Sequence, residues 1–166
     1  MNFNDSKFNI KNGTLWFHKV DDNNWDLNSY KNVCKCKNWD EILHMLKTIK
    51  QFNSGMFFFM KDDIIPMYED DENKKGGYWS FKVNKHNITN IWTRLIYYLC
   101  SGNWNDDNTL HKFHENINGI SISPKINNCI IKIWIKTYEL RNEKQLQKFF
   151  EKYDLGEILY KPHYNK

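Results

Sequence analysis

Two neighbouring segments in the second half of the chain alternate apolar and polar residues with a period of two. Residues 130–137 place isoleucine at alternate positions, with lysine or tryptophan between them, and residues 119–126 set isoleucine against serine and lysine. This period is typical of a strand that buries one face. Two asparagines at 126–129 predict a hairpin between the strands. The pair therefore predicts an antiparallel sheet with one apolar face and one solvated face.

The remaining periodicities predict an α+β fold in which helices cover the apolar face of this sheet. Asn38 is a plausible N-cap for a helix, and Gly102 a plausible C-cap for another. Residues 103–118 are polar and predict a loop. Further strands are expected at 14–20, 56–60, 64–67, 77–83 and 157–160, and helices at 38–49, 88–99 and 142–153.

Length and charge narrow the possible functions. The 166 residues suit one domain, and 40% apolar residues provide for a sizeable core. A net charge of +4 is too small for nonspecific coating of nucleic acid, so an anion has to be held at a site. No apolar run is long enough to span a bilayer, and the polar N-terminus lacks a signal sequence. We expect a cytoplasmic monomer with a flexible segment over residues 1–13.

Metal and enzyme chemistry find little support in the residue pattern. The four cysteines form no Cys-x-x-Cys pair, so we expect no metal site. Asp106, Asp107, His111 and His114 would be the candidates for a metal-dependent hydrolase. They fall in one predicted loop without a third converging element, which favours a solvated surface. The sequence therefore predicts a protein that is not an enzyme.

The polar face of strand 130–137 permits two interpretations. Lys132, Trp134 and Lys136 combine an aromatic ring with ammonium groups, which suits stacking of a base and binding of its phosphates. The same pattern also fits an ordinary half-solvated strand with one semi-buried tryptophan.

Residues 64–79, IIPMYEDDENKKGGYW, favour the first interpretation. They resemble the cap-binding translation initiation factor 4E family, in which a Pro-Met-Trp-Glu-Asp run precedes an asparagine, a Gly-Gly pair and a tryptophan. LWFHKV at 15–20 is similar to the family's first core strand, and IKIWIKT at 131–137 to a later one. Several motifs agree in order along one chain, which makes the signal strong. The resemblance implies a curved antiparallel β-sheet with helices packed on the convex face and a cap-binding cleft on the concave face.

By this resemblance, the ligand is the 7-methylguanosine cap of messenger RNA, and no cofactor is expected. The cationic purine would stack between Trp25 and Tyr68. Glu69 would accept hydrogen bonds from the guanine N1 and N2 groups, and the backbone beside Met67 and Tyr68 would reach O6. Trp134 would pack on the N7 methyl group.

The phosphate side of the implied site departs from the family pattern. Lys125 falls on the family's phosphate-binding arginine, and strand alternation places Lys132 on the same face as Trp134, so both lysines are phosphate candidates. Two further basic positions of the family's phosphate site fall on Asn127 and Ile130, so the site carries less positive charge. Tyr68 stands where most of the family has tryptophan, which makes one stacking surface smaller.

The family binds a helical peptide of the initiation factor 4G scaffold, and of repressors, on its convex face. Here the matching positions include Trp39, Leu43 and Arg94, and the last replaces an acid by a base. This favours a scaffold of that type or a co-diverged partner carrying an acidic peptide. Trp39 and Leu43 also fit a simple core stripe of their helix.

The resemblance implies one cap-binding domain over residues 14–166 that recruits capped messenger RNA to translation initiation through a scaffold partner. Two alternatives stay open. The same pocket would serve a repressor that sequesters capped RNA, and a general single-stranded RNA-binding protein would not distinguish methylated from unmethylated guanine.

Overall fold

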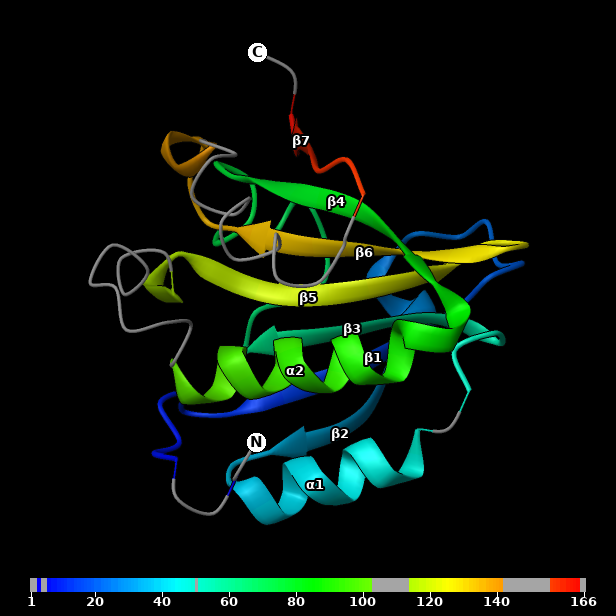
Figure 1. Ribbon diagram of the computed structural model, residues 1–166. Helices are drawn as coiled ribbons and strands as arrows, with labels where there is room; N and C mark the ends of the chain where they lie inside the picture. Colours follow the sequence, from blue (N-terminus) through cyan, green and yellow to red (C-terminus); the bar gives the residue numbers. More distant parts are fainter. Residues whose placement is uncertain (1–2, 4–5, 50, 103–113, 142–155, 165–166) are drawn as a thin grey trace.

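The computed structural model describes residues 3, 6–49, 51–102, 114–141 and 156–164. Within these residues seven strands form one antiparallel sheet in the order β2-β1-β3-β5-β6-β4-β7 (Figure 1). The strands are β1 (Gly13–Lys19), β2 (Lys31–Cys36), β3 (Gly55–Lys61), β4 (Gly77–Asn84), β5 (Ile117–Pro124), β6 (Asn128–Ile135) and β7 (Leu159–Pro162). The α-helices are α1 (Trp39–Thr48) and α2 (Ile88–Ser101).

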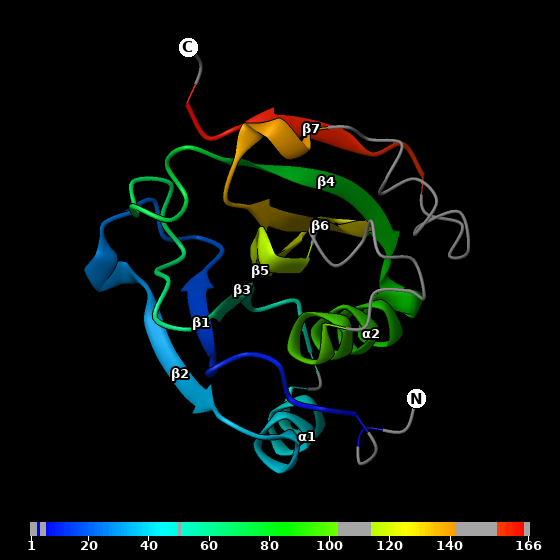
Figure 2. The ribbon, with the colours of Figure 1, turned by 90° about the vertical axis from the view of Figure 1, so that its left-hand side faces the viewer.

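The sheet is curved, and both helices lie on one side of it. Figure 2 shows α1 and α2 together on this side, and the loops of residues 20–30 and 62–76 on the other. The predicted α+β class, a curved antiparallel sheet with helices packed on its convex face, is confirmed.

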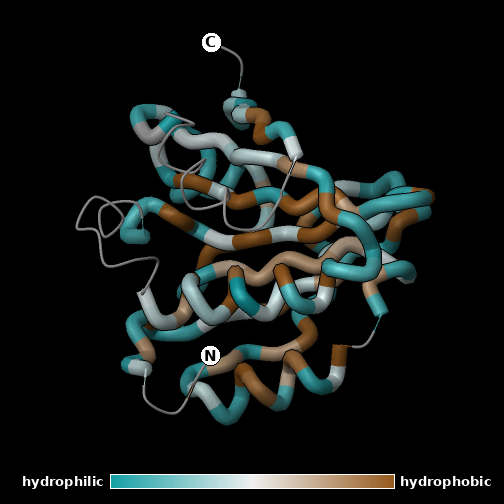
Figure 3. Tube along the Cα trace, viewed as in Figure 1, coloured by the Kyte–Doolittle hydropathy of each residue, from teal (hydrophilic) through white to brown (hydrophobic). Residues whose placement is uncertain are grey.

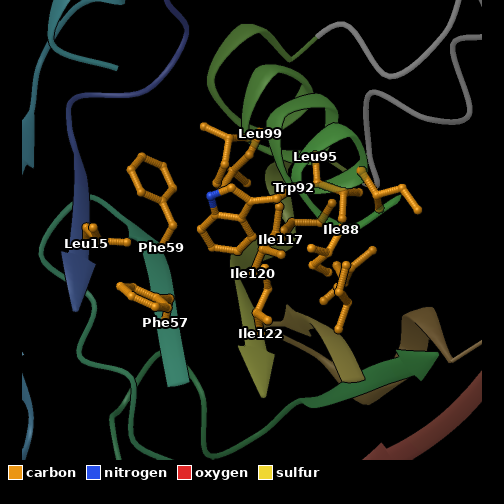
Figure 4. Close-up of a cluster of buried hydrophobic side chains, with 14 of the residues drawn as sticks. Leu15, Phe57, Phe59, Ile88, Trp92, Leu95, Leu99, Ile117, Ile120 and Ile122 are labelled. Atoms are coloured by element: carbon orange, nitrogen blue, oxygen red, sulfur yellow. The ribbon is translucent and has the colours of Figure 1, made fainter. Parts of the chain in front are cut away.

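The main core lies between the helices and the sheet. Trp92 of α2 points onto the sheet beside Phe59, Ile117 and Ile120 (Figure 4). Apolar positions recur along β5 and β6 in Figure 3. The isoleucines of the predicted alternation are completely buried on this side: Ile120, Ile122, Ile131, Ile133 and Ile135.

Local signals define both helices. The Asn38 side chain accepts a hydrogen bond from the backbone N–H of Glu41 at 3.0 Å, which caps α1. Gly102 adopts a left-handed conformation with φ 69°, and its N–H donates to the carbonyl of Tyr98, which ends α2. Both predicted caps are confirmed.

One predicted strand is absent from the structure, and one observed strand was not predicted. The strand predicted at 64–67 is wrong: these residues turn, with the N–H of Met67 donating to the carbonyl of Ile65, and Pro66 has no N–H to offer a neighbouring strand. Strand β2 was not predicted, because it is a mostly exposed, polar edge strand. The helix predicted at 142–153 lies outside the described residues.

The face opposite the helices is less solvated than the strand pattern predicts. Trp134 is only 2% exposed and forms a second buried cluster with Phe58 and Met60. Tyr68 and Ile64 of the 62–76 loop pack against this cluster. The prediction of an entirely solvated face is therefore wrong at Trp134, because a loop distant in sequence covers it.

Alanine substitutions at one buried and one exposed isoleucine test which face of the sheet carries the core. Ile131→Ala should lower the free energy of unfolding by about 2 to 5 kcal/mol, because it opens a cavity among completely buried side chains. Ile126→Ala is the matched control: this isoleucine is 92% exposed, and the change should stay within about 0.5 kcal/mol. Urea denaturation measures both values, and equal losses would contradict the described register.

Candidate functional site

A cavity of about 440 Å³ lies on the side of the sheet opposite the helices. It brings together six of the residues predicted from the sequence, which come from three separate stretches of chain: Trp25, Met67, Tyr68, Glu69, Lys132 and Trp134. Tyr30, Met56, Phe58, Pro66, Ser121 and Ser123 complete the lining. The wall is thus aromatic and apolar, with one carboxylate and one ammonium group.

Trp134 forms a fixed part of the cavity surface. Its indole N–H donates to the hydroxyl of Ser121 on β5 at 2.9 Å. The ring of Phe58 packs edge-on against it, with 6.1 Å between centroids. Because a buried indole N–H needs a partner, Ser121 determines how the ring sits.

Trp25 forms one aromatic wall and comes from the turn after β1. Two side-chain contacts shape this turn: Asp22 accepts from the N–H of Asn24 at 2.9 Å, and Asn24 accepts from the N–H of Asp26 at 2.8 Å. The Trp25 ring is half exposed and stacks on His18 at 4.3 Å, with the planes inclined by only 4°.

Tyr68 forms a second aromatic wall. The ammonium group of Lys132 donates to the Tyr68 hydroxyl at 3.0 Å and lies 4.1 Å from the ring centroid of Tyr78. Burial lowers the pKa of Lys132 and raises the pKa of Tyr68. Lys132 therefore brings a cation to the cavity and fixes the edge of the tyrosine ring.

His163, which follows β7, stacks on Tyr68 at 4.6 Å and lies 4.9 Å from the Trp134 ring. Both of its ring nitrogens are buried, without a hydrogen-bond partner in the described part of the chain. Burial, aided by the nearby charge of Lys132, lowers the pKa of His163 from 6.5 to about 4. The ring is therefore neutral at physiological pH.

The loop that carries Met67, Tyr68 and Glu69 is pinned by buried amides. The Asn73 side chain donates to the carbonyls of Ile65 and Met67, at 2.9 and 2.8 Å. Asn118 of β5 donates in turn to the Asn73 side-chain oxygen at 2.9 Å and to the carbonyl of Glu72 at 2.7 Å. These bonds satisfy backbone groups that no strand pairs, and so they preform the loop.

Glu69 supplies the only carboxylate among the lining residues that the structure describes. Its side chain is exposed, and no hydrogen bond or ion pair engages it within the described residues. The carboxylate is therefore available to accept hydrogen bonds from a ligand.

The structure does not bring Lys125 into the cavity lining. Lys125 lies exposed in the turn between β5 and β6, where its N–H donates to the carbonyl of Asn128 at 2.8 Å. Asp106, Asp107 and His111 lie outside the described residues. His114 is described and is buried, with its carbonyl accepting from the Lys61 ammonium. Among the described residues no group of three His, Cys, Asp or Glu side chains is placed to hold a metal ion.

The predicted partner residues lie on the helices. Trp39 is half-buried in an aromatic cluster with Phe3 and Phe8, at 5.2 and 5.3 Å, and its indole N–H donates to the carbonyl of Ser6. Leu43, one turn along α1, is half-exposed, and Arg94 of α2 donates to the side chain of Asn90 at 3.0 Å. The described N-terminal residues thus pack on the helices.

Sequence reasoning missed several residues of this site. Ser121 and Ser123 share a face with Lys132 and Trp134, so strand alternation would have found them. Tyr30, Phe58 and the two stacking histidines had no such signal, because their roles arise from contacts between distant segments.

A sequence model of the family described as "Eukaryotic initiation factor 4E" matches residues 11–166. The chain belongs to this family. A family member from Eremothecium gossypii is 29% identical over 83 residues, which cover 49% of this chain and 36% of the relative. One from Bos taurus is 25% identical over 140 residues, covering 72% of this chain and 61% of the relative. The matched parts span less than two thirds of either relative.

Solved structures of initiation factor 4E proteins share the fold. Ascaris suum eIF4E-3 in complex with an m2,2,7G cap has a TM-score of 0.74 at 20% identity, covering 96% of this chain and 94% of that one. A schistosome eIF4E in complex with m7GpppG and 4E-BP has a TM-score of 0.78 at 17% identity, covering 95% of this chain and 89% of that one.

Among the described residues no helix is long and apolar enough to cross a membrane.

The neutral state of His163 predicts an acid-sensitive contribution to stability. The unfolded chain takes up a proton near pH 6.5, whereas the folded chain takes it up only near pH 4. Stability should therefore fall between these values as the pH decreases. Urea denaturation across this range should show a smaller loss for His163→Phe than for the native chain. His86→Phe, at an exposed histidine, should keep the native profile, and an unchanged profile in His163→Phe would contradict the burial.

Proposed function

We propose that this protein binds the 7-methylguanosine cap of messenger RNA and brings the RNA to translation initiation through a protein partner. The observation that carries the proposal is the cavity itself, where Trp25, Tyr68 and the unpaired carboxylate of Glu69 meet. Family membership supports it, since relatives of known structure are described in complex with cap analogues.

The aromatic walls suit a cationic purine. Methylation at N7 gives the guanine ring a positive charge, and the electron-rich faces of Trp25 and Tyr68 attract such a ring by stacking and cation–π interaction. Stacking of one base on one aromatic ring is worth roughly 1 to 3 kcal/mol. An unmethylated guanine gains only the stacking part, so the methyl group governs selection.

The polar edge of the cavity suits guanine rather than adenine. The Glu69 carboxylate would accept from N1–H and the N2 amino group of guanine, whereas adenine offers no such pair. The backbone beside Met67 and Tyr68 would meet O6, and Trp134 would pack on the N7 methyl group. Because the loop carrying these groups is held by Asn73, little ordering is needed upon binding.

The cap phosphates would meet the positive charge of this face. Lys132 lies at the cavity and Lys125 in the nearby turn, so both stay phosphate candidates. With Asn127 and Ile130 at two further positions of the family's phosphate site, the electrostatic share of binding should be small and its salt dependence shallow.

The helical face would receive the partner. The schistosome relative is described in complex with 4E-BP, and a C. elegans eIF4E-3 with the 4E-binding protein Mextli. In this chain Trp39, Leu43 and Arg94 are the candidate contacts, with an acidic peptide as the expected match for Arg94. Residues 14–166 would act as one noncatalytic domain in the cytoplasm, where capped RNA meets ribosomes.

Titration with 7-methyl-GTP and with GTP tests the proposal. Only the methylated ligand should strongly quench tryptophan fluorescence, because cation–π attraction to Trp25 adds to stacking and raises its affinity. Glu69→Gln should weaken its binding by about 10-fold or more, since one charged acceptor is lost. Glu157→Gln, at an exposed glutamate outside the cavity, should bind like the native chain. Equal affinity for both nucleotides would favour a general single-stranded RNA-binding protein instead.

A further inference from the structure

We propose that His18 and His163 are a pair of positioning residues that hold Trp25 and Tyr68 open as two opposed walls for a flat cationic ring. The inference rests on the proposed function and adds to it, because it names the groups that position Trp25 and Tyr68 before a ligand binds. Each histidine stacks on one wall, and neither lines the cavity.

His18 is held rigidly beneath Trp25. The ring is completely buried in β1, and its two nitrogens lie 2.8 Å from the backbone carbonyls of Lys19 and Asn24. The second of these carbonyls belongs to the turn that leads into Trp25. These two contacts hold the imidazole in place, and its face packs against the indole, since the two rings are nearly parallel.

His163 supports Tyr68 in a corresponding way. It contacts Tyr68, Trp134 and Tyr78, with 4.6, 4.9 and 5.7 Å between ring centroids. Lys132 holds the hydroxyl end of Tyr68 with a hydrogen bond, and the ring also contacts Trp134 and Tyr78, with 5.2 and 6.1 Å between centroids. The imidazole of His163 is the nearest of these rings, at 4.6 Å, and its stacking fixes the plane of the tyrosine ring.

The two stacks leave one face of each wall for the ligand. A ring has two faces, and a histidine covers one face of Trp25 and one face of Tyr68. Tyr78 also stacks on Tyr68, at 6.1 Å, but it lies only 5.7 Å from His163, so both rings belong to the same side of the tyrosine. Both aromatic rings border the same cavity while both histidines stay out of it. The uncovered faces are therefore those that meet the ligand, in the order His18, Trp25, ligand, Tyr68, His163.

Alanine and phenylalanine variants at each histidine separate stacking from other roles. His18→Ala and His163→Ala should each weaken 7-methyl-GTP binding by about 2- to 10-fold, the usual range for one aromatic pair. His18→Phe and His163→Phe restore a flat ring and should bind within about twofold of the native chain. His44→Ala and His86→Ala, at exposed histidines, are the controls and should change nothing.

Two outcomes overturn the proposal. Alanine variants that are folded and bind like the native chain would show that the stacks position nothing. Phenylalanine variants that are folded and bind as weakly as the alanine variants would show that the histidines act by polarity rather than by stacking.

A measurement on the ligand-free protein separates this proposal from the proposed function. The contribution of Trp25 to the near-ultraviolet circular dichroism is the difference between the spectrum of a protein and the spectrum of its Trp25→Phe form. This signal should fall in the His18→Ala background and persist in the His18→Phe background, whether or not any nucleotide binds. A signal that persists in both backgrounds refutes the positioning role, and a native chain that binds no methylated nucleotide refutes the proposed function alone.

Discussion

The buried isoleucine face of the β5–β6 pair determines which side of the sheet is free for a ligand. Side chains alternate along a strand, so burying Ile120, Ile122, Ile131 and Ile133 against the helices places Ser121, Lys132 and Trp134 on the other side. A slip of one residue in this register would exchange the two sets. The register of this strand pair therefore decides which of its side chains line the cavity.

Polar contacts then convert this face into a site of defined geometry. Asn118 and Asn73 hold the loop that carries Tyr68 and Glu69, and Ser121 fixes the indole of Trp134. Lys132 reaches the Tyr68 hydroxyl. Buried polar groups are costly when unpaired, so each of these bonds favours one arrangement over its neighbours. The cavity is consequently shaped before any ligand arrives, which reduces the ordering needed on binding.

Local signals predicted much of the fold, and contacts between distant segments account for what they missed. Period-two alternation identified β5 and β6, and cap residues placed the start of α1 and the end of α2. β2 carried no such signal, because an exposed edge strand needs no apolar face. Residues 64–67 are apolar like a strand but turn around Pro66, since Asn73 takes up their carbonyls. The six cavity residues that were predicted came from family motifs and from alternation, whereas the histidine stacks depend on tertiary contacts that no local pattern contains.

The central claim is that the methylated guanine binds in the cavity bordered by Trp25 and Tyr68. Nuclear Overhauser contacts from the N7 methyl protons of bound 7-methyl-GTP test it most directly. The account predicts contacts from this methyl group to the rings of Trp25, Tyr68 and Trp134, assigned by loss of each signal in the Trp25→Phe, Tyr68→Leu and Trp134→Phe variants. A second cavity, of about 630 Å³, is lined by Tyr138, Arg141 and Tyr160 and offers the alternative location. Methyl contacts to Tyr138 and Tyr160, with none to Trp25 or Tyr68, would contradict the account.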